Sequence, residues 1–376
     1  MALNLRDRLK RINDQKNTMQ KTEDNEQGTE NKEHSIKKNK EIDLYGLKEY
    51  GWEVCGYKVL KRVVKYKSSL RSKKINYSSL SVIIPDLKNI KIQSPEDFIF
   101  FDLETTGLST GSGTVAFLSA FARIVSGTLH ITQYLLLDYP GQNDFLENIL
   151  SHLKNEKSVI VSFNGKSYDS HILKTMCIIN RIKPPEYQHA DLLHPSRRLW
   201  KRIIGDCSQS SIEAKILNID RENDIQGSLA PEIWFDFLKT GKTERLIGIC
   251  DHNVKDIIGL SSILTAMINI ADNPFDEKYR YDIERLALYW RKNLRKKDTD
   301  LQDDALKKTG DKLLQKAAEN NSPFAVYIYA YDQLKKGNYE ESLKFIRRGL
   351  KLFKEETKWH QILTRRKERL KKLIKK

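Results

Sequence analysis

Residues 96–272 show two kinds of apolar spacing, which together predict a compact α/β domain. Short apolar runs at 98–101 and 158–163 are typical of buried strands. Apolar residues three and four positions apart indicate helices between and after the strands. Further strands are expected at 115–125 and 129–137, and helices at 144–153, 167–180, 210–217 and about 246–270. Ser210 and Glu213 fit a capping box at the start of one of these helices.

The segments before this domain differ from it in composition. Residues 1–44 are rich in Lys, Glu, Asn, Asp and Gln and contain no aromatic side chain, which predicts a disordered charged N-terminal segment. Residues 45–95 carry many aromatic and β-branched side chains and predict a small β-rich lead-in. Serine-rich stretches at 68–72 and 77–81 indicate turns or loops within it.

Residues 273–376 contain no strand pattern and predict an all-α C-terminal region. The apolar residues between 325 and 350 suit two antiparallel helices, with a break at 336–338. A helix, a short glycine turn, a tyrosine and a second amphipathic helix resemble one tetratricopeptide unit. A single unit is poorly stable alone, so it should pack on its neighbours, and these helices could bind a protein partner. The tail at 365–376 is strongly basic.

The charge of the chain favours a polyanionic partner. The formal net charge is +16, which points to nucleic acid, although basic tails could also serve solubility alone. The four cysteines form no CxxC pair, so neither a zinc site nor a disulfide framework is indicated. No apolar run follows the early charges or is long enough to span a bilayer. We therefore expect a cytoplasmic protein with reduced thiols and no membrane partner.

Two carboxylates stand at the end of the first apolar run. Asp102 and Glu104 are two positions apart, and in a strand such residues share one face. They would repel each other unless a cation lay between them, so the pair favours a divalent metal site. A bare DxE pattern also occurs in solvated turns, but DLETTG directly after four apolar residues is far more specific.

Two later segments carry acids that could reach the same place. Asp169 follows a buried strand and an Asn-Gly turn at the start of a helix. Taken alone it suits an N-terminal helix charge, which the macrodipole favours. His252 and Asp256 are four positions apart on a helix and can point into one cleft, although alone such a pair is usually a surface pair.

These segments resemble the Exo I, Exo II and Exo III motifs of the DEDD superfamily, the DnaQ-like exonucleases with a ribonuclease H-like fold. Within it, residues 96–272 are most similar to the YprB-like family. The resembling pieces are DLETTGLSTGSGTVAFL, VSFNGKSYDSHIL, HADLLHPSRRLW, RENDIQGSLAP and HNVKDIIGL. The resemblance implies a central mixed sheet flanked by helices. One departure is that superfamily members carry either Tyr with three intervening residues before the last Asp, or His with four, whereas His252 has three. The two options differ in direction by about 100° around the helix.

The resemblance also implies an activity, a 3′→5′ exonuclease hydrolysing DNA or RNA by a two-metal mechanism. The metal ligands would be Asp102, Glu104, Asp169 and Asp256, holding two divalent cations, Mg²⁺ or Mn²⁺. His252 would be the base or orienter for the attacking water. The alternative is that His252 only hydrogen-bonds a neighbouring carboxylate.

The same resemblance places the substrate. The terminal nucleotide would meet the turn after the first motif, at Thr105, Thr106, Gly107 and Leu108, with Gly111 and Gly113 allowing close approach. Asn164 and Lys166 could contact phosphate or orient ligands. Arg197 and Arg198, with Trp200, Lys201 and Arg202, suit a single strand or a 3′ end, or else an ordinary basic surface. Asp191 has an apolar context and predicts a buried structural role.

Two other functions compete with the exonuclease. One is a catalytically silent nucleic-acid-binding or scaffold protein, against which all four carboxylates argue. The other makes the C-terminal helices a protein-docking module that carries the main function.

Overall fold

The computed structural model describes residues 44–68, 70, 75–107, 113–154, 157–294 and 304–374. The prediction for residues 1–44 therefore lies almost wholly outside the described residues, as do Leu108 and Gly111. The described residues all belong to one compact unit, Asp43–Lys376.

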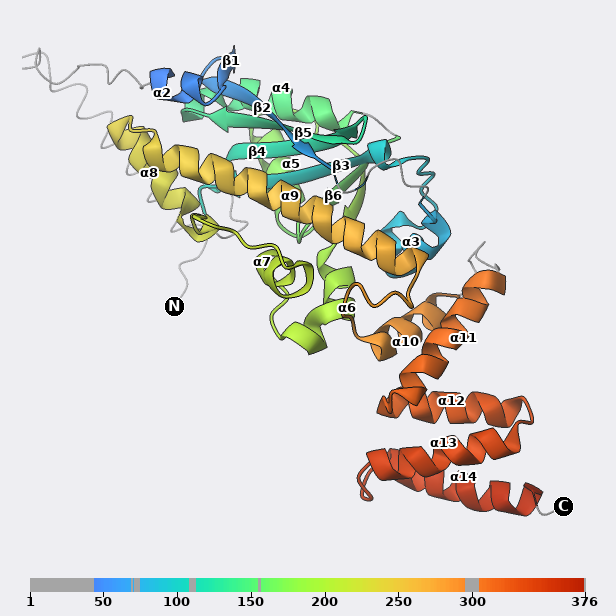
Figure 1. Cartoon of the computed structure of the whole chain (residues 1–376). Helices are drawn as coiled ribbons and strands as arrows, with labels where there is room; N and C mark the ends of the chain where they lie inside the picture. Colours follow the sequence, from blue (N-terminus) through green and yellow to red (C-terminus); the bar gives the residue numbers. More distant parts are fainter. Residues whose placement is uncertain are drawn as a thin grey trace, which may run out of the picture. The chain divides into compact units, whose positions relative to one another are not determined.

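Among the described residues, seven strands form one mixed sheet in the order β1-β2-β5-β4-β3-β6-β7 (Figure 1). Neighbours from β1 to β3 in this order pair antiparallel, while β3, β6 and β7 pair parallel. The mixed sheet confirms the predicted fold class. The strands are β1 Glu53–Gly56, β2 Val59–Lys67, β3 Phe98–Thr105, β4 Ala116–Val125, β5 Thr128–Leu136, β6 Val159–Ser162 and β7 Gln188–Asp191.

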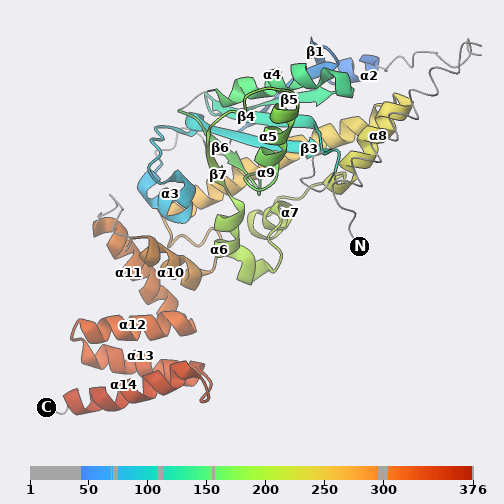
Figure 2. The ribbon, with the colours of Figure 1, turned by 180° about the vertical axis from the view of Figure 1, so that it is seen from behind.

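Helices cover both faces of the sheet. Helix α9, Glu244–Asp272, crosses the face seen in Figure 1. Helix α5, Asp169–Ile179, lies on the face seen in Figure 2, where the Ala116 amide contacts the Met176 sulfur at 3.1 Å. The other helices of this part are α2 Leu44–Glu49, α3 Tyr77–Ile83, α4 Gln142–Leu150, α6 Leu193–Ile204, α7 Gln209–Ile212 and α8 Ala230–Thr240.

The β3 strand explains how the core and the predicted site are arranged. Phe98 and Phe100 are fully buried and belong to the same apolar cluster as Val254 and Ile257 of α9. Alternate residues of a strand share a face. Asp102, next but one after Phe100, therefore faces α9 at the point where the apolar part of the strand ends.

Two local predictions were wrong. The serine-rich stretch at 77–81 is not a loop but most of α3, because Asn76 caps it by accepting from the Ser79 amide at 3.0 Å and Leu80 is buried. The cap of α7 is Ser208 rather than Ser210. Glu213 does not close a capping box; it begins a π-helical turn, Glu213–Leu217, and its carboxylate bonds Arg221.

The C-terminal region is all-helical, as predicted. The expected pair is α12 Pro323–Lys335 and α13 Tyr339–Leu352, separated by Gly337 at φ +79°. In the described residues these helices are flanked by α10 Ile283–Leu294, α11 Asp304–Glu319 and α14 Lys358–Ile374. Each helix packs on the next, and α10 also contacts α3 and α6. The likeness to a tetratricopeptide repeat stays a prediction.

Helix α9 is also, by length and composition, the one helix of the described chain that could cross a bilayer. We interpret it as a core helix, because 72% of its most apolar window is buried inside the structure. The described cysteines are free; Cys177, Cys207 and Cys250 are buried and Cys55 is partly so.

Candidate metal centre

The end of β3 and the start of α5 bring three of the predicted carboxylates into one electrostatic environment. Glu104 is 9% exposed and Asp169 is 5% exposed. Burial raises the pKa of Asp102 well above its usual range, and the charges of Asp256, Asp169 and Glu104 raise it further. Asp102, Glu104 and Asp169 therefore lie close enough to repel one another.

The other two acids respond in the same way. Burial raises the pKa of Glu104 well above its usual range, with help from the charges of Asp256, Asp169 and Asp224. Burial likewise raises the pKa of Asp169, to about 7, and the charges of Asp191 and Asp256 add to it, although hydrogen bonds from backbone amides oppose the shift. Each carboxylate is thus destabilised in its charged form by its surroundings.

Helix α9 supplies the fourth carboxylate and a set of polar neighbours. His252 and Asp256 share one face of the helix, as their spacing predicts. Among the described residues, the ligand atoms of Glu104, His252 and Asp256 all lie within 4.8 Å of one another. Four acidic side chains with oxygen ligands, crowded together and buried or partly buried, suit hard divalent cations such as Mg²⁺ or Mn²⁺. The residues therefore fit the predicted metals.

A series of hydrogen-bonded side chains, beginning at Asn253, fixes the orientation of Asp102. Asn253 is fully buried and its Nδ2 donates to Asp102 Oδ2 at 2.7 Å. Gln133 Nε2 in turn donates to Asn253 Oδ1 at 2.9 Å, and Arg62 donates to Gln133 Oε1. Arg62 ends the chain in an ion pair with Asp251 at 2.9 Å. Because every link is made, the Asp102 carboxylate is held in one orientation.

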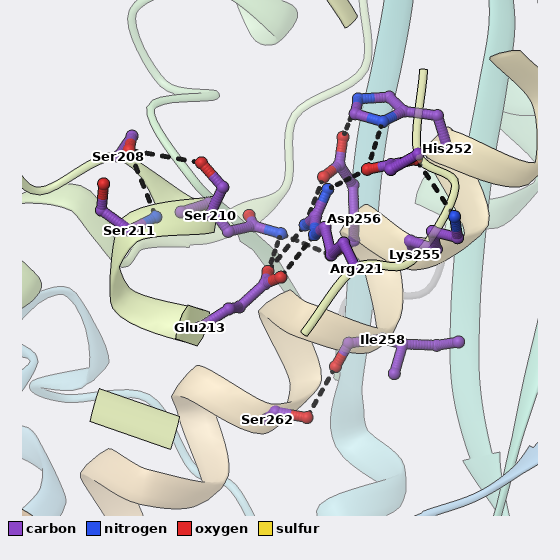
Figure 3. A network of polar contacts seen from close by, with 12 residues as sticks. Ser208, Ser210, Ser211, Glu213, Arg221, His252, Lys255, Asp256, Ile258 and Ser262 are labelled. Atoms are coloured by element: carbon purple, nitrogen blue, oxygen red, sulfur yellow. Dashed lines mark hydrogen bonds and ion pairs between the residues drawn. The ribbon is translucent and has the colours of Figure 1, made fainter. Parts of the chain in front are cut away.

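His252 lies between two carboxylates (Figure 3). Its Nε2 is 3.1 Å from Asp256 Oδ2 and its Nδ1 is 3.0 Å from Asp224 Oδ2. Burial lowers the pKa of His252, but the hydrogen bonds and charges of Asp256 and Asp224 outweigh it and raise the pKa to about 9. In this arrangement His252 hydrogen-bonds a neighbouring carboxylate, which is the contact expected if its role is not catalytic. It can act as a base only if Nε2 leaves Asp256.

The pattern of the sequence did not single out Arg221, Asp224 or Asn253. Arg221 bonds Glu213 and pairs with Asp256 at 2.7 Å and with Asp224 at 3.2 Å. Arg221 and Asp224 were present in the resembling piece RENDIQGSLAP, but an irregular loop has no period that tells which side chain turns inward. Asn253 was not identified from the sequence, because the pattern singled out its neighbour His252 instead.

The predicted nucleotide-binding turn is held mainly by its own residues. Thr105 Oγ1 donates to the Gly107 carbonyl at 2.8 Å and lies 2.9 Å from the Tyr168 hydroxyl. Tyr168 also donates to the Gly107 carbonyl. Thr106 Oγ1 accepts from the Val115 amide at 3.0 Å. The two threonine hydroxyls therefore shape the turn in this structure.

Asn164 and Lys166 lie in the turn between β6 and α5. Their amides donate to the Asp191 carboxylate at 2.9 and 3.1 Å, so Asp191 has the buried structural role that its context predicted. Asn164 adopts φ +67°, which asparagine tolerates better than most residues. The Lys166 ammonium pairs with Asp86 at 2.7 Å and is 41% exposed.

Arg197 and Arg198 lie on α6, at two adjoining clefts. The first cleft, of about 390 Å³, is lined by Asn164, Arg197, Lys201 and Gln209, among others. Gln209 connects it to the metal centre, because its Nε2 donates to the Asp256 carbonyl at 2.7 Å. The second cleft, of about 420 Å³, lies between α6 and α10 and is lined by His194, Arg197, Arg198, Arg202, Arg285, Leu288, Tyr289 and Lys292.

This chain is similar to a family model, to a curated protein and to a solved structure. Residues 99–268 match the model of the RNase_H superfamily. The protein YprB of Bacillus subtilis (strain 168) is 32% identical over 240 residues, which are 60% of this chain and 57% of that protein. This chain thus spans a little over half the length of that relative. A solved structure, the zinc-bound complex of E. coli ExoI with ssDNA, aligns over 52% of this chain and 42% of that chain, with 17% identity and a TM-score of 0.29.

The sheet, its flanking helices and the family match together define the part of the chain around residues 99–268 as a ribonuclease H-like domain. The all-helical region that follows it lies outside the matched residues.

Proposed function

We propose that this chain is a divalent-metal-dependent nuclease, and more narrowly a 3′→5′ exonuclease acting on DNA or RNA. The observation that carries the proposal is the meeting of Asp102, Glu104, Asp169 and Asp256 in one shielded centre. Protein folding alone gains nothing from burying Asp102, Glu104 and Asp169 beside Asp256, whose charge raises the pKa of each of these three carboxyls. A site for positive charge is the simplest reason for building such a centre.

In this proposal the four carboxylates would hold two cations. Bound cations would lower the pKa of a water molecule and neutralise the charge that develops on the phosphate. Asp102 keeps its orientation through Asn253. The turn of Thr105, Thr106 and Gly107, followed by Leu108, would receive the terminal nucleotide. His252 would orient or deprotonate the attacking water through Nε2.

The clefts along α6 support nucleic acid as the substrate. In the second cleft, Arg198 lies 4.1 Å from the Tyr289 ring, and Arg202 pairs with Glu284 and Asp282. Arg197, Arg285 and Lys292 have no acidic partner within the described part of the chain. Unpaired cations beside an aromatic ring suit a phosphate backbone with stacked bases. Asn164, which lines the first cleft, and Lys166, in the same turn, would contact phosphate.

The test is a hydrolysis assay with the full chain. We expect Mn²⁺ or Mg²⁺ to support degradation of end-labelled single-stranded DNA or RNA, with mononucleotides released from the 3′ end. Chelator and the variant Asp102→Asn should each abolish it. The variant should fold, because asparagine can still accept from Asn253 and no longer adds charge to the centre. Metal-dependent binding of nucleic acid without any hydrolysis would contradict the nuclease and support the silent binding protein instead.

A further inference from the structure

The loop from Asn218 to Gln226 lies against the catalytic face of α9 in an interlocking fit. A Cβ atom added at Gly259 of α9 would lie 1.7 Å from Glu213 Oε1. A Cβ atom added at Gly248, also in α9, would lie 2.2 Å from the Ile225 side chain. Two helix positions without side chains thus admit Glu213, which precedes the loop, and Ile225, which lies within it. The loop is therefore placed by packing as well as by charge.

Arg221 is the centre of this interface. Its guanidinium is 13% exposed and contacts three carboxylates, those of Glu213, Asp224 and Asp256 (Figure 3). Glu213 is 1% exposed, and both of its oxygens are held, at 2.5 and 2.7 Å, by Arg221. A buried bidentate pair of this kind fixes geometry rather than adding much stability. Nη1 is consequently aimed at Asp224, while Nη2, which also bonds Glu213, contacts Asp256 Oδ1 at 2.7 Å.

Asp224 completes the arrangement from the same loop. Its Oδ2 lies 3.0 Å from His252 Nδ1, and its Oδ1 lies 3.3 Å from the Lys255 ammonium. A carboxylate on one ring nitrogen of a histidine sets the orientation and tautomer of the ring. Gly227 leaves room for the ring, since a Cβ atom there would lie 2.8 Å from His252 Nε2.

We propose that Arg221 and Asp224 are positioning residues of the metal centre: Arg221 fixes Asp256 through Oδ1, and Asp224 fixes His252 through Nδ1. Asp256 Oδ2 and His252 Nε2, which contact each other at 3.1 Å in this structure, are then the two atoms that would separate to serve cation and water. This inference rests on the proposed nuclease function and adds two residues to it. The positioning role also explains why Arg221 of the loop bonds both Glu213, the buried acid of the π-helical turn, and Asp256 of α9.

The competing possibility is that the positive charge of Arg221 occupies the place of a metal ion beside Asp256. Its contact with Asp256 would then have to break before a metal could bind, and Arg221 would weaken metal binding instead of supporting it. The two possibilities predict opposite changes in metal affinity, so a binding measurement separates them without any assay of hydrolysis.

The experiment is calorimetric titration of the full chain with Mn²⁺, comparing wild type, Arg221→Met, Asp224→Asn and the control Arg245→Met. Arg245 lies on α9, is 51% exposed and, within the described part of the chain, forms a surface ion pair with Glu232. We expect Arg221→Met to weaken Mn²⁺ binding by about 10- to 100-fold, as loss of an orienting partner does. Arg221→Lys should restore part of the affinity, and the control should match wild type.

Asp224→Asn keeps the shape of the side chain and is the second, milder variant. We expect Mn²⁺ affinity within about threefold of wild type, a turnover about 10- to 100-fold lower, and altered ¹⁵N shifts of the His252 ring. Mn²⁺ binding to Arg221→Met that is equal to or tighter than wild type, or an unchanged His252 spectrum and turnover in Asp224→Asn, would overturn the inference while leaving the nuclease intact. Absence of Mn²⁺ binding to wild type would overturn both.

Discussion

Single residues of the site differ in how far their sequence context predicts them. Asp102 and Glu104 could be placed because strand alternation puts them on the face of Phe98 and Phe100, which belong to the same apolar cluster as residues of α9. Asp256 could be placed because four positions make one helix turn. Arg221 could not, because its three partners lie in separate segments and only the folded loop brings them together.

Among single residues, the first prediction concerns His252. His252→Ala should lower turnover by about 10²- to 10⁴-fold if the ring serves the attacking water. Nucleic-acid binding, measured in Ca²⁺ by fluorescence anisotropy, should survive, because the clefts along α6 are untouched. A fall of less than about threefold in turnover would leave His252 as a partner of Asp256 and Asp224 alone.

A second residue, His152, predicts how stability depends on pH. Its ring stacks on Phe121 with centroids 4.6 Å apart, and Nε2 lies 3.0 Å from the Tyr134 hydroxyl. Burial, together with the charges of Arg123 and Lys61, lowers the pKa of His152 to about 4 from the ordinary 6.5. Between these values the unfolded chain binds a proton that the folded chain does not. Stability from this residue is therefore complete above pH 6.5 and is lost as the pH falls towards 4.

The loss should approach about 3 kcal/mol in the free energy of unfolding by pH 4. Denaturant unfolding at several pH values measures it, in wild type and in His152→Gln. The variant is less stable at pH 7 but should lose less on acidification. His171→Gln, at an exposed position of α5, serves as the control and should follow wild type. An acid response of His152→Gln identical to that of wild type would show that other groups cause it.

The elements of the domain were easier to predict than their ends. Buried strands β3 and β6 and the long helix α9 carry strong apolar patterns and lie where the sequence placed them. Helix α3 was missed because its serine-rich sequence hides three buried apolar residues, Leu80, Val82 and Ile83. The capping prediction for Ser210 failed because the Glu213 carboxylate forms an ion pair with Arg221 instead of bonding the start of the helix.

Among the secondary-structure elements, the prediction concerns substrate binding in the clefts beside α6. Arg197→Gln combined with Arg285→Gln should weaken binding of single-stranded substrate. It should also make the salt dependence shallower, by a slope of roughly 0.7 for each phosphate that is no longer neutralised. Turnover at saturating substrate should be retained, because neither side chain touches the carboxylates. The control is Lys351→Gln, which removes an exposed charge on α13. Unchanged affinity and salt slope in the double variant would place the substrate elsewhere.

In the whole molecule, the ribonuclease H-like domain and the helical region are joined through α10, which packs on α3 and α6. The sequence showed the class of each part but only two of the C-terminal helices. The others have amphipathic patterns that are diluted by lysine and arginine. The basic tail belongs to a packed helix, since Leu370 is 1% exposed and Arg366 lies 4.4 Å from the Tyr331 ring.

Deleting residues 365–376 should consequently do two things. Affinity for nucleic acid and its salt dependence should fall if the tail binds phosphate, while turnover at saturation is kept. The melting temperature should fall as well, because the packing of Leu370 is removed. Replacing Lys371 and Lys372 by Gln separates the effects, since both are exposed and their replacement should change binding alone. Unchanged binding in both variants would assign the charge of the tail to solubility.

Anomalous diffraction from a crystal grown with Mn²⁺ would show directly whether the four carboxylates form a catalytic metal centre. We predict anomalous peaks bonded to oxygens of Asp102, Glu104, Asp169 and Asp256, with Asn253 still on Asp102 and Arg221 still on Asp256. The same crystal form of Asp102→Asn should lose or weaken these peaks. Well-ordered wild-type carboxylates at saturating Mn²⁺ with no anomalous peak between them would contradict the proposed metal centre.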